Sequence, residues 1–174
     1  MKSSALAAVR KFHWSFLAAP YPIPETLIGA DYAGYLKLIF GQWISEKHGH
    51  KVMEVIDVYI DAFKNDSVIR SSCEDYRAGA TIDIENERAD LVSSYEEHLN
   101  SSVQKEGRYV EVPTLLLYSA ANLGGEFDMK AVWENFVNNK LTAHSIGDGA
   151  GHFVNEEKPE ECTEVLLDWL KATL

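Results

Sequence analysis

Apolar residues recur at helical spacing through the first hundred residues of the chain. The clearest set repeats at intervals of three and four residues and comprises Val52, Val55, Ile56, Tyr59, Ile60 and Phe63. This period places the set on one face of a helix that runs over residues 52–63. Composition and the residues that begin or end each segment predict further helices over residues 3–18, 31–46, 67–78 and 82–104. Residues 20–24 are predicted to be extended, because the prolines in this segment disfavour helix.

The pattern changes at Val110, after which one continuous apolar run and a second short segment replace the helical spacing. Residues 114–119 (Thr-Leu-Leu-Leu-Tyr-Ser) and residues 141–146 have the length of strands. The continuous apolarity of the first run indicates a strand buried on both faces, as in a parallel sheet covered by helices. Two parallel strands alone leave both edges open, so further strands should complete the sheet. The order of elements predicts a helical region over residues 1–107 and a β-α-β-α unit over residues 108–174.

Loops and helix ends complete the expected order of elements. Asp31 and Asn65-Asp66 are predicted to cap the helices that follow them, and Asp128 to cap a helix through about Val137. Residues 122–126 and 147–151 are predicted loops. Pro159 is expected to begin the last helix.

Composition and charge restrict the partners of the chain. Its 174 residues carry a formal net charge of -11, from 27 acidic and 16 basic residues, which argues against binding to nucleic acid or to anionic membranes. The isolated Cys73 and Cys162 fit a reducing compartment. The N-terminal apolar run is too short for a signal peptide, and no apolar run approaches the roughly 20 residues of a membrane span. We therefore expect a soluble, cytoplasmic protein that binds neither nucleic acid nor membrane.

The most informative motif surrounds His152. A short strand, a glycine-rich loop, the sequence Gly151-His152-Phe153 and a helix that begins at Pro159 follow one another. This series resembles the C-terminus of an α/β-hydrolase, in which the catalytic histidine follows the last long strand. A loop at the carboxyl end of that strand places the imidazole at the rim of the sheet, where the nucleophile turn also emerges. The resemblance implies the C-terminal portion of an α/β-hydrolase fold: a helical cap (residues 1–107), then the last β-α-β-α unit of a parallel sheet.

Three further blocks of sequence carry a more specific resemblance: Phe12–Pro20 with Ile28–Asp31, Cys73–Asp83, and Phe127–Trp133. They resemble the haloacetate (fluoroacetate) dehalogenases, within the epoxide-hydrolase-like branch of that fold. In that family an aspartate displaces the halide and forms an ester, and a histidine activates the water that hydrolyses the ester. The resemblance implies a small haloacid substrate, no cofactor and no metal.

The resemblance also assigns roles to particular residues. It makes His152 the general base, and it makes His13, Trp14 and Tyr76 donors of hydrogen bonds to the leaving halide. Asp128 is a candidate orienting acid, because related hydrolases place an acid after the penultimate strand. His13 and Trp14 also fit core packing in an apolar helix. His48 and His50 lack a third ligand at suitable spacing, so no metal site is predicted.

Part of the catalytic machinery of that family has no counterpart in the sequence. No Gly-x-Asp-x-Gly or Gly-x-Ser-x-Gly elbow lies between a strand and a helix. The arginines that bind the substrate carboxylate in that family are also missing, and so is the acid that orients the histidine, which precedes the cap in these dehalogenases. The chain is therefore expected to be truncated and inactive alone. One alternative is an epoxide or ester hydrolase of the same fold, although Tyr76 has no obvious partner of the kind that epoxide hydrolases use. Another is a non-catalytic fragment that acts only in association, such as a homodimer.

Overall fold

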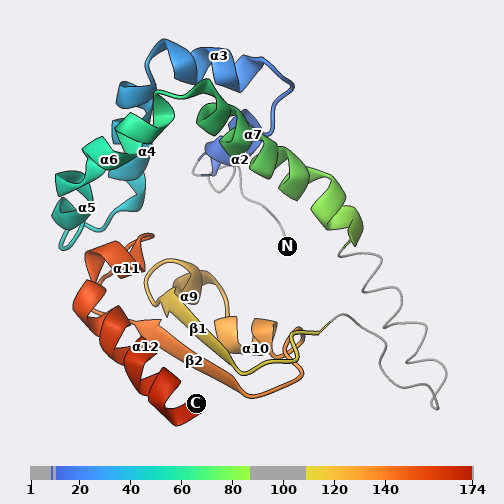
Figure 1. Cartoon of the computed structure of the whole chain (residues 1–174), viewed down its shortest axis with the longest axis vertical. Coiled ribbons are helices and arrows are strands. Elements are labelled where there is room, and N and C mark those ends of the chain that lie inside the picture. Colours follow the sequence, from blue (N-terminus) through green and yellow to red (C-terminus); the bar gives the residue numbers. More distant parts are fainter. Residues whose placement is uncertain (1–8, 10, 87–108, 174) are drawn as a thin grey trace. The chain divides into compact units, whose positions relative to one another are not determined.

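The structure, a computed structural model, describes residues 9, 11–86 and 109–173. The chain forms two compact units (Figure 1). Unit 1 comprises the described residues of Met1–Tyr35 and Val58–Gly107, and unit 2 those of Leu36–Asp57 and Arg108–Leu174. The predicted division into a cap over residues 1–107 and a core over residues 108–174 stays a prediction. The segment Leu36–Asp57 belongs to the same compact unit as the C-terminal residues.

Unit 1 is helical. It contains α2 (Phe12–Leu17), α3 (Ile23–Ala30), α7 (Asp66–Ala80), the start of α4 (Tyr32–Trp43) and most of α6 (Ile56–Phe63). Helices α2 and α3 both contact α7, and Figure 1 shows α3 running beside it. The core between these helices is formed by the buried side chains of Leu17, Ile28, Ile69 and Cys73. Residues 82–86 are also helical, and the rest of the helix predicted to extend to residue 104 lies outside the described residues.

Two helices of unit 1 begin at the predicted capping residues. The backbone N–H of Gly34 donates to Oδ1 of Asp31 at 2.9 Å, at the first turn of α4. The N–H of Ser67 donates to Oδ1 of Asn65 at 3.0 Å, at the start of α7. Both bonds satisfy backbone donors that the helix itself leaves without acceptors, so the prediction of these caps is confirmed.

The prediction of an extended segment over residues 20–24 is wrong. Helix α3 begins at Ile23 and holds Pro24 in its first turn. Proline lacks an N–H group, but the N–H groups of a first turn have no partner within the helix, so proline is tolerated there.

The predicted single helix over residues 52–63 is also wrong. Helix α5 (His50–Glu54) ends at Val55, whose N–H donates to the carbonyl of Val52, and α6 begins at Ile56. The interruption leaves Val55 43% exposed, whereas Val52 and Ile56 are buried. A bond across three residues tightens the final turn and so changes the direction in which the next side chains face.

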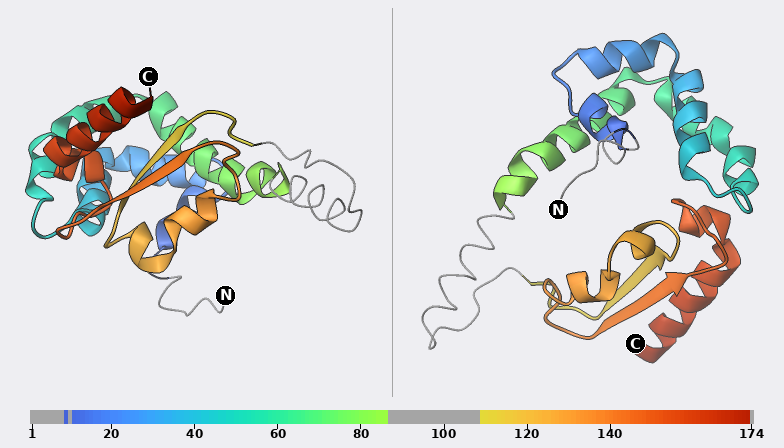
Figure 2. Two further views of the ribbon diagram at one scale, coloured as in Figure 1. Left: turned by 90° about the horizontal axis from the view of Figure 1, so that it is seen from below. Right: turned by 180° about the vertical axis from the view of Figure 1, so that it is seen from behind.

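Unit 2 is built on two parallel strands, β1 (Thr114–Ser119) and β2 (Leu141–Ile146), which confirms both predicted strands. Thr114 pairs with Leu141 at one end of the ladder and Ser119 with Ile146 at the other. Figure 2 (left) shows α12 (Pro159–Thr173) on one side of the strands and α10 (Met129–Trp133) on the other. In the part of the chain that the structure describes, the sheet has these two strands.

The connections of unit 2 differ in part from those predicted. The expected loop over residues 122–126 contains a short helix, α9 (Leu123–Glu126), and the expected loop after β2 is followed by another, α11 (Val154–Glu157). Asp128 caps α10 as predicted, but that helix ends at Trp133 rather than near Val137. Val137 instead forms a parallel bridge with Val110, which ends the helix and extends the pairing of the strands. None of the described helices combines the length and apolarity needed to span a bilayer.

The core of unit 1 can be tested with two neighbouring residues of α3. Ile28 is 1% exposed, whereas Leu27 is 61% exposed. We expect Ile28→Ala to lower the free energy of unfolding by about 2–5 kcal/mol, because it leaves a cavity in the core. Leu27→Ala, the matched control, should change it by less than about 0.5 kcal/mol. Urea unfolding followed by circular dichroism measures both, and equal effects would contradict this assignment of the core.

Candidate active site

His152 lies in the loop that joins β2 to α11. Asp148 and Gly149 in this loop both have positive φ, at 53° and 72°. Glycine adopts this left-handed conformation without steric cost, and aspartate tolerates it better than most residues do. The reversal carries the chain from the carboxyl end of β2 to His152, which stands at the position where the sequence predicts a catalytic histidine.

The loop before His152 lies directly against the backbone at the end of α4. The N–H of His152 donates to the carbonyl of Trp43 at 2.9 Å. A Cβ atom on Gly151 would lie 2.6 Å from the nitrogen of Ser45 and 2.8 Å from the carbonyl oxygen of Trp43. Such distances exclude a side chain at position 151. The glycine that precedes the histidine in the motif is therefore required by the close contact between the backbone of the loop and that of α4.

A buried carboxylate holds these two backbones together. Glu157, on α11, is fully buried, and Oε2 accepts hydrogen bonds from the N–H of Ser45 at 3.1 Å and of Gly151 at 2.9 Å. The hydroxyl of Ser45 also donates to Oε2, and the N–H of Phe153 donates to Oε1 at 3.3 Å. These donors offset the cost of removing the carboxylate from water. Sequence reasoning missed Glu157, whose only signal was its place in the segment after the histidine.

Aromatic rings surround the imidazole of His152. Its ring centroid lies 5.3 Å from that of Trp43 and 5.1 Å from that of Phe153, and Phe153 in turn contacts Phe40 at 4.8 Å. Burial lowers the pKa of His152, and the negative charge of Glu157 opposes part of that effect. A lowered pKa keeps the imidazole neutral near pH 7, which is the form that can accept a proton.

The structure places Asn122, rather than Asp128, next to the imidazole. Nδ2 of Asn122 lies 3.4 Å from Nδ1 of His152. Oδ1 of Asp128 accepts from the N–H of Ala131 at 3.0 Å and so caps α10. Among the described residues no hydrogen bond joins Asp128 to His152, and the role of Asp128 as orienting acid stays a prediction. Sequence reasoning missed Asn122, which it placed in a loop without a role.

An apolar cavity of about 230 Å³ opens beside His152 within unit 2. Side chains of β1 and of α10 form most of its wall, among them Leu117, Met129 and Trp133. Asn122 also lines it. The cavity therefore brings an imidazole and an amide to the edge of an otherwise apolar space, which is the usual composition of a small-molecule site.

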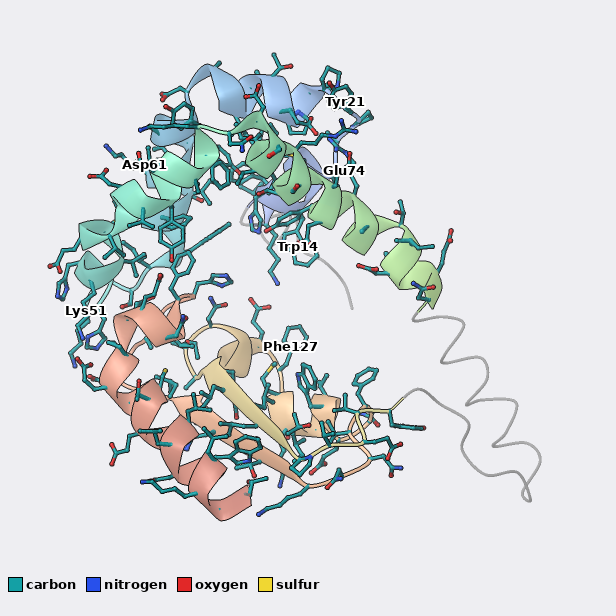
Figure 3. All side chains as sticks on the ribbon, in the orientation of Figure 1. Trp14, Tyr21, Lys51, Asp61, Glu74 and Phe127 are labelled. Atoms are coloured by element: carbon teal, nitrogen blue, oxygen red, sulfur yellow. The ribbon has the colours of Figure 1, made fainter. Side chains whose placement is uncertain are left out.

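The predicted halide-binding side chains come together in unit 1. His13 and Trp14 are neighbours on α2, and the ring of Tyr76, on α7, lies 6.1 Å from the first and 5.8 Å from the second. Trp14, labelled in Figure 3 beside α7, is 58% exposed. Burial, and then the charge of Asp75, raises the pKa of Tyr76, so its hydroxyl stays protonated and can donate. The three rings thus form one aromatic group with N–H and O–H donors, named here the donor cluster.

Arg77 fixes the part of α7 that carries the donor cluster. Its Nε donates to the carbonyl of Ala19 at 2.9 Å, and Nη2 pairs with Glu25 of α3 at 2.8 Å. Nη1 pairs with Glu74 at 3.1 Å. The guanidinium therefore joins α7 to α3 and to the segment between α2 and α3. The roles that the sequence suggests require the imidazole of His152 and the rings of the donor cluster to open into one cavity. This stays a prediction, because the cluster belongs to unit 1 and His152 to unit 2.

Charged groups support the histidine loop from its other side. Asp148 accepts hydrogen bonds from Lys47 and, at 3.3 Å, from Lys158, and Nε2 of His48 lies 3.2 Å from its Oδ2. Lys47 and Lys158 together lower the pKa of Asp148 to about 2. Within the described ranges, no group of three or more His, Cys, Asp or Glu side chains is arranged to hold a metal ion.

The importance of the Glu157 carboxylate can be tested by removing its charge. Glu157→Gln replaces an acceptor oxygen with an NH₂ group that faces N–H donors, and we expect the free energy of unfolding to fall by about 1–3 kcal/mol. Glu164→Gln, at an exposed position on α12, is the control and should have little effect. Urea unfolding of both variants makes the comparison. A Glu157→Gln protein as stable as the control would show that the carboxylate does not hold the loop.

The ion pairs of Asp148 predict a dependence of stability on pH. Because the folded-state pKa lies near 2, below the ordinary 3.8, the carboxylate contributes stability above about pH 4 and loses it as the pH falls toward 2. Asp148→Asn keeps a side chain that tolerates positive φ and removes the charge. We expect its Tm to lie below that of the wild type at pH 7 and the difference to vanish near pH 2. A difference in Tm that stays constant with pH would contradict the role of the ion pairs.

Comparisons with known proteins show what the chain as a whole is similar to. No protein-family model matches the chain. The chain is 33% identical over 164 residues to a fluoroacetate dehalogenase from Burkholderia sp, a match that covers 91% of this chain and 47% of that protein. It therefore spans about half the length of that relative.

Solved structures match the fold over almost the whole chain. A proposed α/β-hydrolase from Nostoc sp PCC 7120 is 29% identical with a TM-score of 0.76, over 97% of this chain and 52% of that protein. A proposed epoxide hydrolase from Pseudomonas aeruginosa, solved as a variant, is 25% identical with a TM-score of 0.75, over 99% of this chain and 52% of that one. A proposed acyltransferase from Salmonella enterica is 26% identical with a TM-score of 0.78, over the same shares of each chain. The chain is therefore a homologue of fluoroacetate dehalogenase and has the fold of the C-terminal portion of an α/β-hydrolase.

Proposed function

We propose that this chain supplies the general base and the halide-binding side chains of a hydrolytic haloacid dehalogenase. The donor cluster is the observation that carries the proposal. Its residues come from two helices far apart in the sequence, and the rings of His13 and Trp14 both contact the ring of Tyr76. Each ring is apolar apart from an N–H or O–H group. Such groups stabilise a leaving halide without binding water strongly.

The proposed reaction has two steps. A carboxylate oxygen of an aspartate attacks the α-carbon of the haloacid, so that a C–O bond forms while the carbon–halogen bond breaks and the halide leaves toward the donor cluster. Water then attacks the carbonyl carbon of the resulting ester and passes one proton to His152. As the tetrahedral intermediate collapses, the acyl C–O bond breaks, the leaving alkoxide takes the proton back from the histidine to give the hydroxyacid, and the aspartate carboxylate is restored with release of the second proton of the water. The sequence holds no nucleophile elbow, so the aspartate would come from the half of the α/β-hydrolase fold that this chain does not match.

The environment of His152 supports its part in the second step. Burial among Trp43 and Phe153 favours the neutral imidazole, which accepts the proton of the attacking water. The Glu157 network fixes the backbone on both sides of the histidine, so the ring can hold one orientation while the ester forms. A base that is fixed in position needs little reorganisation when the water arrives.

A chimera tests the proposal. In it this chain replaces the segment of the Burkholderia fluoroacetate dehalogenase that it matches, and the nucleophile half of that protein is kept. We expect fluoride release from fluoroacetate, measured with an ion-selective electrode, and none from the present chain alone. His152→Ala should reduce turnover by roughly 100-fold or more and accumulate a carboxymethyl ester visible by mass spectrometry.

His50→Ala is the matched control, because His50 is exposed on α5, and this variant should keep the turnover of the chimera. A chimera that folds cooperatively but releases no fluoride would contradict the proposed dehalogenation. Equal turnover in the His152→Ala and His50→Ala chimeras would contradict the role of His152 as general base but would leave the proposed dehalogenation standing.

Epoxide hydrolysis is a second candidate function. It is favoured by Tyr35, a tyrosine that the sequence analysis did not identify as a partner of Tyr76. Tyr35 packs against the same core cluster as Tyr76. Burial, followed by the proximity of Tyr76, raises the pKa of Tyr35 to about 12, so both hydroxyls stay protonated. Two phenolic donors could polarise the oxygen of an epoxide. Hydrolysis of styrene oxide by the same chimera, without fluoride release, would favour this candidate over dehalogenation.

A further inference from the structure

Trp43 is the last residue of α4, and its backbone is held against the histidine loop. Its carbonyl is one of the last four that an α-helix leaves without a donor of its own, and it accepts from the N–H of His152 at 2.9 Å. The N–H of Ser45, two residues later, donates to Oε2 of Glu157 at 3.1 Å. The backbone that carries the indole is therefore fixed to the backbone that carries the imidazole.

The indole of Trp43 contacts the imidazole and two phenyl rings. Its ring centroid lies 5.3 Å from that of His152, with the two planes inclined by 49°. It stacks on Phe40, one turn earlier on α4, at 6.4 Å and 26°, and lies 6.2 Å from Phe153. Side chains packed on several rings have little freedom to turn. The indole therefore keeps one orientation beside the imidazole.

This aromatic contact removes part of the imidazole from water. His152 is exposed as a residue, so the rings around it cover only one part of its surface. The partial cover is enough to lower the pKa of His152, and desolvation is the larger cause of that shift. An indole has one of the largest apolar surfaces among side chains and a single N–H group. Trp43 can therefore exclude water from the side of the imidazole that it covers.

Charged groups near the imidazole do not explain its lowered pKa. Glu157, on α11, acts in the opposite direction and favours the protonated form. Asp148, in the histidine loop, accepts from Lys47 and Lys158. The side chain beside Nδ1 is a neutral amide. Among the described residues, the aromatic cover is thus what favours the neutral base.

We propose that Trp43 is a positioning residue of the general base, whose indole holds the imidazole of His152 in place and keeps water from the side that it covers. This inference rests on the proposed function of His152. The indole acts on the solvation of the ring, so the tautomer is left to the acid that precedes the cap in the dehalogenases that the sequence resembles. Trp43 lies within residues 1–107, so a segment of the predicted cap contributes directly to the base.

Nuclear magnetic resonance of the chain, labelled with ¹⁵N in histidine, measures the pKa of His152 without requiring turnover. The signals of His152 are those that His152→Ala lacks. We expect Trp43→Ala to raise this pKa by about 0.5–1 unit, because water then reaches the covered side and solvates the charged form. Trp43→Phe, which keeps a smaller ring, should give an intermediate value. Both variants keep the backbone carbonyl that accepts from His152, so they test the indole alone.

Gln42→Ala is the matched control, because Gln42 is exposed beside Trp43 on α4. It should leave the pKa of His152 unchanged. A pKa in Trp43→Ala equal to that of the wild type would overturn the inference, and so would a shift of the same size in Gln42→Ala. Thermal melting identifies a merely structural role, which would lower Tm in Trp43→Ala and leave the pKa as it was. If Trp43→Ala does not fold, Trp43→Phe decides by the same criterion.

The chimera separates a failure of this inference from a failure of the proposed function. A general base must be neutral to accept a proton, so fluoride release rises with pH through the pKa of His152. Trp43→Ala should move this limb of the pH profile upward by about 0.5–1 unit. If release depends on His152 but the limb does not move, then Trp43 does not shield the base, and the dehalogenase proposal stands. If the pKa rises as expected and a folded chimera releases no fluoride, then the shielding holds and the proposed reaction fails.

Discussion

The buried carboxylate of Glu157 is the constraint on which the histidine loop depends. It accepts from backbone donors of Ser45 and Gly151, residues that are far apart in the sequence. Without it, these partly buried donors would lose their acceptor, at a cost of up to about that of one lost hydrogen bond for each. The absence of a side chain at Gly151 follows from the same contact, because the two backbones meet too closely for a Cβ atom. One carboxylate therefore determines the position of His152 and the sequence around it.

The chemistry of His152 depends on a balance between burial and charge. The aromatic rings of Trp43 and Phe153 remove water from the imidazole and favour its neutral form, while the negative charge of Glu157 favours the protonated form. Burial is the larger of the two effects, since the pKa is lowered. Glu157 acts mainly through hydrogen bonds to the backbone on either side of the ring. The loop can thus include a buried negative charge and still present a neutral imidazole.

The sequence predicted what depends on neighbouring residues and missed what depends on distant ones. A continuous apolar run identified β1, and a second segment of strand length identified β2. Asp31, Asn65 and Asp128 cap helices as expected, because a strand segment or a cap is a local pattern. The break at Val55 was missed because one tightened turn leaves the apolar period almost unchanged. Glu157 and Asn122 were missed for another reason. Their partners, Ser45 and His152, lie 112 and 30 residues away, and no local pattern encodes such a pairing.

The charges around the donor cluster bear on what the cluster can bind. Arg77 follows Tyr76 directly and would be the obvious group to bind a substrate carboxylate, yet its guanidinium pairs with Glu25 and Glu74. A cation already neutralised by two carboxylates attracts a substrate anion weakly. Among the described residues, Arg77 thus brings no unpaired positive charge to the cluster, whose N–H and O–H groups would suit the charge developing on a leaving halide better than the carboxylate of a bound haloacid. In a haloacid dehalogenase the groups that bind the carboxylate would then have to come from the nucleophile half, so that the two ends of the substrate are held by different parts of the fold.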